Sequence, residues 1–224
     1  MTTRINRRSL GGAAFAISAL GFLSATAHAD EGWHNFDVTG TSPPLDMTMT
    51  RVNDGKQVTQ ADYKGRVVLL YFGYTYCPDV CPTTLTNVTD VLDKLGPLAQ
   101  RVRVLFVTVD PNRDTSEVLK EYVTAFGPQF DGLRGSSNAL ADLARRYRIA
   151  YSVTSETKDH PYEVTHSSAI YIFDTTGAAR LLVPSMGSQT PDIDGTASDL
   201  RRLINGEGAP SLVSHFITFL RNLV

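Results

Sequence analysis

The segment around residues 66–82 constrains the fold most, because an apolar run leads directly into a loop rich in cysteine and proline. Residues 67–72 read VVLLYF and end at Gly73, and residues 77–82 then read CPDVCP. An uninterrupted apolar run is typical of a strand that is covered on both faces of a sheet. The two cysteines of the chain, Cys77 and Cys81, therefore follow a buried strand.

The rest of the chain alternates between strand and helix patterns. Further strands are predicted at residues 102–109, 168–174 and 179–183, and helices at residues 83–95, 118–126, 139–147 and 196–204. The turn at residues 175–177 indicates that the last two strands form a hairpin. This order predicts an α/β fold with a central mixed sheet and helices on both faces.

The order of the elements also places the cysteines at a position where sites form. In open α/β sheets, sites gather beyond the carboxyl ends of the strands. Pro78 and Pro82 lack an N–H, which excludes a helix interior but suits a first helical turn. Cys81 is therefore expected at a helix N-terminus, where the positive partial charge should lower its pKa below about 8.5.

The spacing of the cysteines allows them to form a disulfide. Residues four apart in one helical turn are separated by about 6 Å along the axis, which a disulfide accepts. A permanent disulfide across so short a loop would stabilise the fold little. The spacing therefore favours a reversible redox pair or a metal site.

A metal site needs a third ligand, and the chain offers His34, His160, His166 and His215 outside its N-terminal segment. His166 precedes the strand predicted at residues 168–174. If that strand runs antiparallel to the first one, its beginning lies beside the carboxyl end of the first strand, so His166 would face the cysteines. His160 is the competing candidate, and the other two are interpreted as hydrogen-bonded or surface residues.

The chemistry of this ligand set favours copper. Two thiolates and one imidazole form a soft set of low coordination number, which suits Cu(I) and can also hold Cu(II). Structural zinc normally takes four ligands, and the chain has no third cysteine. Asp79 could complete a zinc site, but the preferred interpretation is that it caps the helix that follows.

Three segments together resemble the signatures of the Sco/SenC family. They are GYTYCPDVCPTTL from Gly73, VDPNRDT from Val109 and VTHSSAIY from Val164. The resemblance extends from about residue 46 to residue 204 and implies a thioredoxin-like fold. It further implies a copper chaperone that helps to assemble the dinuclear copper centre of a respiratory cytochrome oxidase, with the oxidase subunit that carries this centre as its partner.

Carried onto this chain, the resemblance implies Cys77, Cys81 and His166 as the metal ligands. The family often has an aspartate before the ligand histidine, where this chain has Thr165. The middle signature also has a structural interpretation, in which Asp114 and a glutamate three residues later form a capping box. Arg113 in the same loop is an alternative contact for a partner.

Two other functions remain open from the sequence. One is an enzyme, a thiol-disulfide oxidoreductase in which Cys77 attacks and Cys81 resolves, keeping the cysteines of the client reduced. The other is a redox sensor or a structural relative without metal. His166 favours the metallochaperone, since an oxidoreductase needs no imidazole there. Residues 162–173 also lack the cis-proline that thioredoxin-type enzymes carry beside their cysteines.

The N-terminal segment predicts export to the periplasm. Arg4, Arg7 and Arg8 precede an apolar stretch at residues 10–25, and residues 27–29 read AHA, a small-residue cleavage site. We expect a cleaved signal peptide over residues 1–29 rather than a membrane anchor, exported by either the general or the twin-arginine route. Cleavage would leave 18 basic and 23 acidic side chains. This balance argues against a nucleic-acid partner.

The remaining chain is divided into three parts. Residues 30–45 are predicted to be an N-terminal extension, residues 46–206 the thioredoxin-like copper-binding domain, and residues 207–224 an amphipathic tail. The apolar face of the tail is expected to dock against the domain, with a membrane-surface contact as the alternative.

Overall fold

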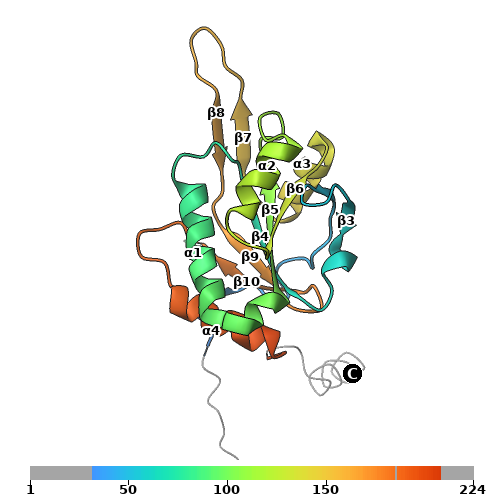
Figure 1. Cartoon of the computed structure of the whole chain (residues 1–224), viewed down its shortest axis with the longest axis vertical. Coiled ribbons are helices and arrows are strands. Elements are labelled where there is room, and N and C mark those ends of the chain that lie inside the picture. The colour runs from blue at the N-terminus through green and yellow to red at the C-terminus, as the bar shows by residue number, and fades with distance from the viewer. Residues whose placement is uncertain (1–31, 185, 208–224) are drawn as a thin grey trace, which may run out of the picture. The chain divides into compact units, whose positions relative to one another are not determined.

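The computed structural model describes residues 32–184 and 186–207 (Figure 1). Its strands are β1 (Phe36–Asp37), β2 (Thr48–Arg51), β3 (Gln57–Thr59), β4 (Val67–Gly73), β5 (Val102–Thr108), β6 (Phe130–Arg134), β7 (Tyr151–Thr154), β8 (Glu163–His166), β9 (Ile170–Phe173) and β10 (Ala179–Val183). Its α-helices are α1 (Val80–Leu95), α2 (Ser116–Thr124), α3 (Ser137–Arg146) and α4 (Ile193–Ile204). Two 3₁₀-helices, η1 (Gln60–Tyr63) and η2 (Gly96–Arg101), precede β4 and β5.

Eight strands form one mixed sheet in the order β1-β10-β9-β4-β5-β6-β2-β3. Strands β4, β5 and β6 are parallel, whereas β9 runs antiparallel to β4 with Ile170 opposite Tyr71. The start of β9 therefore lies beside the carboxyl end of β4. This is the arrangement on which the sequence argument for His166 depended, and it is confirmed.

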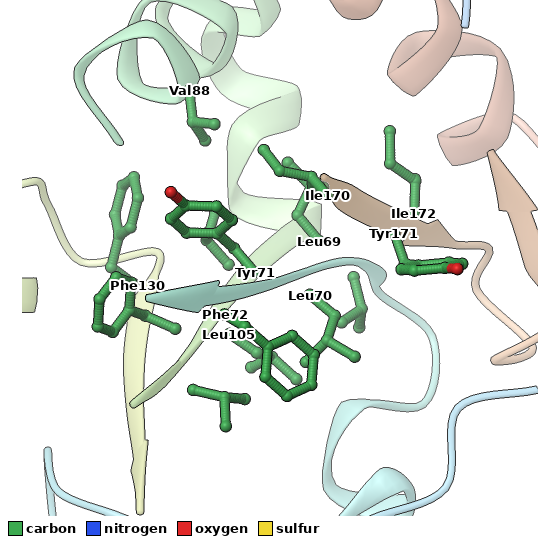
Figure 2. Close-up of a cluster of buried hydrophobic side chains, with 14 of the residues drawn as sticks. Leu69, Leu70, Tyr71, Phe72, Val88, Leu105, Phe130, Ile170, Tyr171 and Ile172 are labelled. Carbon is green, nitrogen blue, oxygen red and sulfur yellow. The ribbon is translucent and has the colours of Figure 1, made fainter. Parts of the chain in front are cut away.

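Helices cover both faces of the sheet, as predicted. Alternate side chains of β4 point to opposite faces, and Figure 2 shows Tyr71 on the same side as Val88 of α1, with Phe72 on the other side. The ring of Tyr71 also contacts Phe106, which in turn contacts a ring of α2. Tyr147, at the end of α3, packs against two rings of β9. Helices α1 and α2 therefore lie on one face and α3 on the other.

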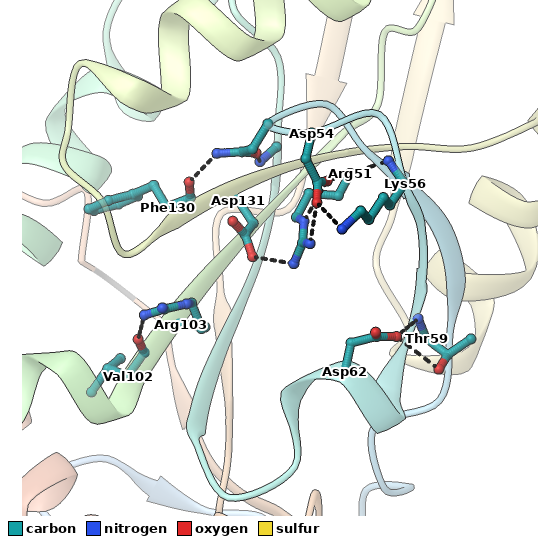
Figure 3. A network of polar contacts seen from close by, with 11 residues as sticks. Arg51, Asp54, Lys56, Thr59, Asp62, Val102, Arg103, Phe130 and Asp131 are labelled. Atoms are coloured by element: carbon teal, nitrogen blue, oxygen red, sulfur yellow. Dashed lines mark hydrogen bonds and ion pairs between the residues drawn. The ribbon is translucent and has the colours of Figure 1, made fainter.

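Strand β6 was not predicted from the sequence, because it carries an aspartate and a glycine. Asp131 is buried, and a guanidinium nitrogen of Arg51 lies 3.7 Å from its carboxylate (Figure 3). Gly132 leaves space for its neighbours, since an added Cβ would lie 2.7 Å from Val52 and 3.0 Å from Leu119. Both residues are explained by tertiary contacts that local strand propensity does not report.

The edge strands and the hairpin β7–β8 were also absent from the prediction. Strand β1 lies in the predicted N-terminal extension and pairs with β10. The segment just before it is fixed by Asp199 of α4, whose carboxylate accepts hydrogen bonds from the backbone N–H groups of His34 and Asn35. Residues 33–37 thus pack as part of this fold.

The predicted leader over residues 1–29 lies outside the described residues, and so does the predicted tail beyond Glu207. Within residues 32–184 and 186–207, none of the helices combines the length and apolar character needed to cross a bilayer.

We expect the substitution Gly73→Ala to lower the free energy of unfolding by about 1–3 kcal/mol, the usual range for overpacking a core. The added Cβ would lie 2.7 Å from a ring carbon of Phe106 and 2.9 Å from the Cys81 sulfur, both buried. Urea denaturation of the reduced protein measures the effect. An unchanged midpoint and slope would show that the strand end can relax.

Candidate metal centre

The loop that carries the cysteines joins the end of β4 to the start of α1. The N–H of Cys77 bonds to the carbonyl of Tyr74 at 3.3 Å, which forms a tight turn before the helix. Cys81 lies at the N-terminus of α1, as predicted, but the helix begins at Val80 and therefore includes Cys81 and Pro82 in its first turn, three residues earlier than predicted. Both cysteines are free thiols in this structure.

The helix cap differs from the prediction. Asp79 occupies the N-cap position, but its φ and ψ of −142° and −68° are not those of an extended capping residue, and its side chain makes no capping hydrogen bond. Instead, the N–H of Cys81 points at the sulfur of Cys77, 3.4 Å away. The sulfur of Cys77 therefore accepts a hydrogen bond from one of the otherwise unpaired N–H groups of the first helical turn.

The third donor comes from the hairpin. His166 is the last residue of β8, and its Nε2 lies 3.3 Å from the sulfur of Cys81. Its Nδ1 lies 3.0 Å from the carbonyl oxygen of Ser167. A carbonyl only accepts, so Nδ1 carries the proton and the lone pair of Nε2 is directed at the sulfur.

Cys77, Cys81 and His166 thus form a cluster whose ligand atoms lie within 4.8 Å of one another, and no other such group of histidine, cysteine and acidic side chains is found among the residues that the structure describes. His160 belongs to the turn of the hairpin, where its backbone N–H bonds to a threonine hydroxyl. His34 lies 3.6 Å from Asp192 at the start of α4. The remaining candidate, at position 215, lies outside the described residues.

Burial controls the protonation of the site. Cys81 is 0% exposed, whereas Cys77 and His166 are half-buried. Burial raises the pKa of the Cys81 thiol to about 12, and this outweighs the hydrogen bonds that lower it. The prediction that the helix N-terminus lowers this pKa is therefore wrong, because desolvation is the larger effect. Burial lowers the pKa of His166, which keeps its imidazole neutral at pH 7.

Two tyrosines of the β4 end surround the donors and were not singled out from the sequence. The rings of Tyr71 and Tyr74 meet the His166 ring edge-on, with centroids 6.1 Å and 5.7 Å away. The Tyr71 hydroxyl lies 3.6 Å from the Cys81 sulfur. The alternation of side chains along β4 could have identified Tyr71 from the sequence, because it places this residue on the face of the sheet that packs against α1.

The middle signature supports the cysteine loop. Asp114 is buried and accepts hydrogen bonds from the hydroxyls of Thr75 and Thr108, at 2.6 Å and 2.5 Å. The capping box predicted for Asp114 is wrong, because Thr115 caps α2 by accepting the N–H of Val118. Asp114 instead ties the loop that precedes Cys77 to the end of β5. That Arg113 contacts a partner stays a prediction.

The side chain of Thr165, which stands where the family often has an aspartate, bonds across the hairpin. Its hydroxyl lies 2.9 Å from the hydroxyl of Ser152 on β7. The carbonyl of Ser167 holds the His166 ring instead. The orientation of the imidazole in this chain is therefore set by a backbone group rather than a carboxylate.

The fold and the site define a thioredoxin-like protein with a dithiol and an imidazole at the carboxyl edge of its sheet. The sequence matches the SCO1/SenC family over residues 48–205, and the chain belongs to this family.

A similar curated protein is the mitochondrial SCO2 homolog of Bos taurus, 42% identical over 125 residues, which are 55% of this chain and 47% of that protein. The chain spans about half the length of the curated relatives it matches. Among solved structures, Bradyrhizobium japonicum ScoI with copper bound is 35% identical, with a TM-score of 0.62 over 72% of this chain and 98% of that chain. Arabidopsis thaliana ScoI with copper bound is 32% identical, with a TM-score of 0.63 over 73% of this chain and 98% of that chain.

We expect the reduced, metal-free protein to lose stability as the pH rises above about 9. An exposed cysteine thiol has a pKa of about 8.5–9, whereas burial raises the pKa of Cys81 in the folded protein to about 12. The stability that comes from the buried thiol is therefore complete below pH 9 and is lost as the pH approaches 12. Urea denaturation between pH 7 and pH 10.5 measures the trend.

The control variant is Cys81→Ala. It loses the packing of the sulfur at every pH, but it has no thiol to ionise at position 81. The difference in free energy of unfolding between the two proteins should shrink with rising pH. A constant difference would contradict the assignment of a raised pKa to Cys81.

Proposed function

We propose that this protein is a copper chaperone that binds the metal through the thiolates of Cys77 and Cys81 and the Nε2 of His166. The observation that carries the proposal is the convergence of these three donors within 4.8 Å at one edge of the sheet. Relatives of the same family have been solved with copper bound, which supports the choice of metal. Copper is the cargo of the protein in this proposal.

The donor set fits copper better than zinc. Two sulfurs and one imidazole satisfy Cu(I), which accepts three soft ligands, whereas structural zinc requires a fourth. Asp79, the fourth ligand considered from the sequence, lies outside the donor cluster, and its carboxylate accepts a hydrogen bond from the Thr83 hydroxyl. His166 is neutral near pH 7, so its lone pair is available without loss of a proton.

The burial of the ligands supports an order of ligand exchange. Cys77 is half-buried and Cys81 is fully buried, so an incoming thiolate would replace Cys77 first. Cys81 and His166 would hold the metal until a second donor arrives. We infer that the client is the oxidase subunit that carries the dinuclear copper centre, a partner that the resemblance to the Sco/SenC family supports.

A second activity, thiol-disulfide exchange with the client, is favoured by the same asymmetry. The accessible Cys77 sulfur would attack a client disulfide and form a mixed disulfide. Cys81 would then displace the client, which leaves with two thiols, while Cys77 and Cys81 become joined as a disulfide. The two electrons that reduce the client therefore come from this dithiol, which must be reduced again before it can bind copper.

We further propose that the protein acts in the periplasm after its leader, residues 1–29, has been removed. The basic start, the apolar stretch and the AHA site in the sequence support this location.

Anaerobic titration of the reduced protein should show one tight equivalent of Cu(I). Cys77→Ser, Cys81→Ser and His166→Ala should each weaken binding by more than about 100-fold, since loss of even an outer-shell partner costs 10–100-fold. Competition with a chromophoric Cu(I) chelator measures the dissociation constants. His160→Ala is the control and should bind as the parent does; tight binding by His166→Ala with loss in His160→Ala would refute the proposed third ligand.

Copper affinity should rise with pH. The Cys81 thiol, with a pKa near 12, must release its proton on binding. The apparent association constant should therefore increase by about tenfold per pH unit from this proton alone between pH 7 and pH 9. The same chelator competition measures the slope, with the protonation of the chelator taken into account. A pH-independent affinity would contradict a protonated Cys81 in the metal-free protein.

A further inference from the structure

The hairpin that carries His166 forms a sheet of its own. Strands β7 and β8 pair with each other and are not hydrogen-bonded to the eight-stranded sheet. Figure 1 shows this hairpin extending away from the body of the fold. An isolated two-stranded hairpin is only marginally stable. The position of His166 relative to the cysteines therefore depends on the side chains that tie the hairpin down.

One such set of contacts is centred on a buried carboxylate in the VDPNRDT segment that begins at Val109. Asp110, which follows β5, is 0% exposed. One of its oxygens accepts a hydrogen bond from the hydroxyl of Tyr162 at 2.6 Å. The other accepts from Nε of Arg113 at 2.5 Å. Tyr162 lies just before β8, so the carboxylate links the base of the site to the strand that ends at His166.

The guanidinium of Arg113 contacts both segments that carry ligands. Its central carbon lies 4.0 Å from the ring centroid of Tyr162 on the hairpin side. On the cysteine side it lies 4.9 Å from the ring of Tyr76 and 5.8 Å from that of Tyr74. Tyr76 directly precedes Cys77. A single planar cation therefore lies between the loop of the cysteines and the hairpin of the histidine.

We propose that Asp110, Arg113 and Tyr162 form a latch that holds the hairpin against the cysteine loop and so sets the distance between the imidazole and the two sulfurs. These are positioning residues, which act through His166 and do not touch the metal. The proposal rests on the proposed function for its consequence in copper binding. The latch itself is a property of the metal-free chain and can be tested without copper.

The chemistry of the latch requires arginine rather than any cation. A guanidinium can stack its flat face on aromatic rings while its edge donates to a carboxylate, whereas an ammonium is a hydrated point charge. Arg113→Lys therefore keeps the charge beside Asp110 but removes the stacking. Tyr162→Phe keeps the ring and removes only the hydroxyl that bonds to the carboxylate. Each variant breaks one half of the latch.

Hydrogen exchange of the reduced, metal-free protein gives the first test. Both variants should increase the exchange rate of the amides in residues 151–166 by about three- to tenfold, the effect of losing one partly exposed cation–π contact or one hydrogen bond to a charged group. The amides of β4 and β5 should keep their protection. Two control variants should exchange as the parent does. Tyr76→Phe retains the ring that the guanidinium contacts, and Arg145→Lys alters an exposed ion pair elsewhere on the fold.

The copper-bound proteins give the second test. In Cu(II)-loaded parent, the electron paramagnetic resonance spectrum should contain nitrogen coupling from His166. In Arg113→Lys and Tyr162→Phe this coupling should be reduced, and the affinity should fall by about 10–100-fold, as for other groups that orient a ligand. A purely structural role would lower stability without changing the nitrogen coupling.

The two tests separate the latch from the proposed function. If the parent binds copper but both variants keep the parent's exchange rates and nitrogen coupling, the latch is refuted and the chaperone proposal stands. If the parent fails to bind copper, the function is refuted, while exchange in residues 151–166 still decides whether the latch exists.

Discussion

The antiparallel pairing of β9 with β4 is the constraint on which the site depends. Because the two strands run in opposite directions, the chain that enters β9 arrives at the edge where β4 ends. His166 and Cys81 are 85 residues apart in the sequence, yet the Nε2 of His166 lies 3.3 Å from the sulfur of Cys81. The strand order thus brings the ligand-bearing segments together, and the loops set the distances between the ligand atoms.

The site also depends on a balance between two electrostatic effects at the start of α1. The helix N-terminus favours a negative sulfur, but the enclosure of Cys81 between the helix and the sheet disfavours any charge. Burial wins at Cys81, which stays protonated in the metal-free protein. A bound metal ion would bring a positive charge into the same space and would reverse this preference. If the site binds copper as proposed, its protonation is therefore coupled to the metal.

The main features of the fold could be predicted because they follow from local patterns of apolar residues in the sequence. The apolar runs of β4 and β5 and the helical stripes indicate burial directly. The expected strand order, together with the first and third signatures, placed His166 beside Cys77 and Cys81. Strand β6 could not be predicted from its own residues, since Asp131 is stabilised by Arg51 from another strand. The same limit explains the errors in assigning helix caps. Asp79 looks like a cap in the sequence, but its backbone conformation does not present its side chain to the helix.

The enclosure of Cys81 has a consequence for chemical damage. Peroxides react with thiolates far faster than with thiols, so a protonated and buried sulfur is a poor target. An oxidant would instead meet the more accessible Cys77 and convert it to a sulfenic acid. The neighbouring Cys81 can condense with that group to give a disulfide, which a reductant can reopen. The same geometry that brings the three donors together would thereby convert an oxidised Cys77 into a disulfide, which is a reversible product.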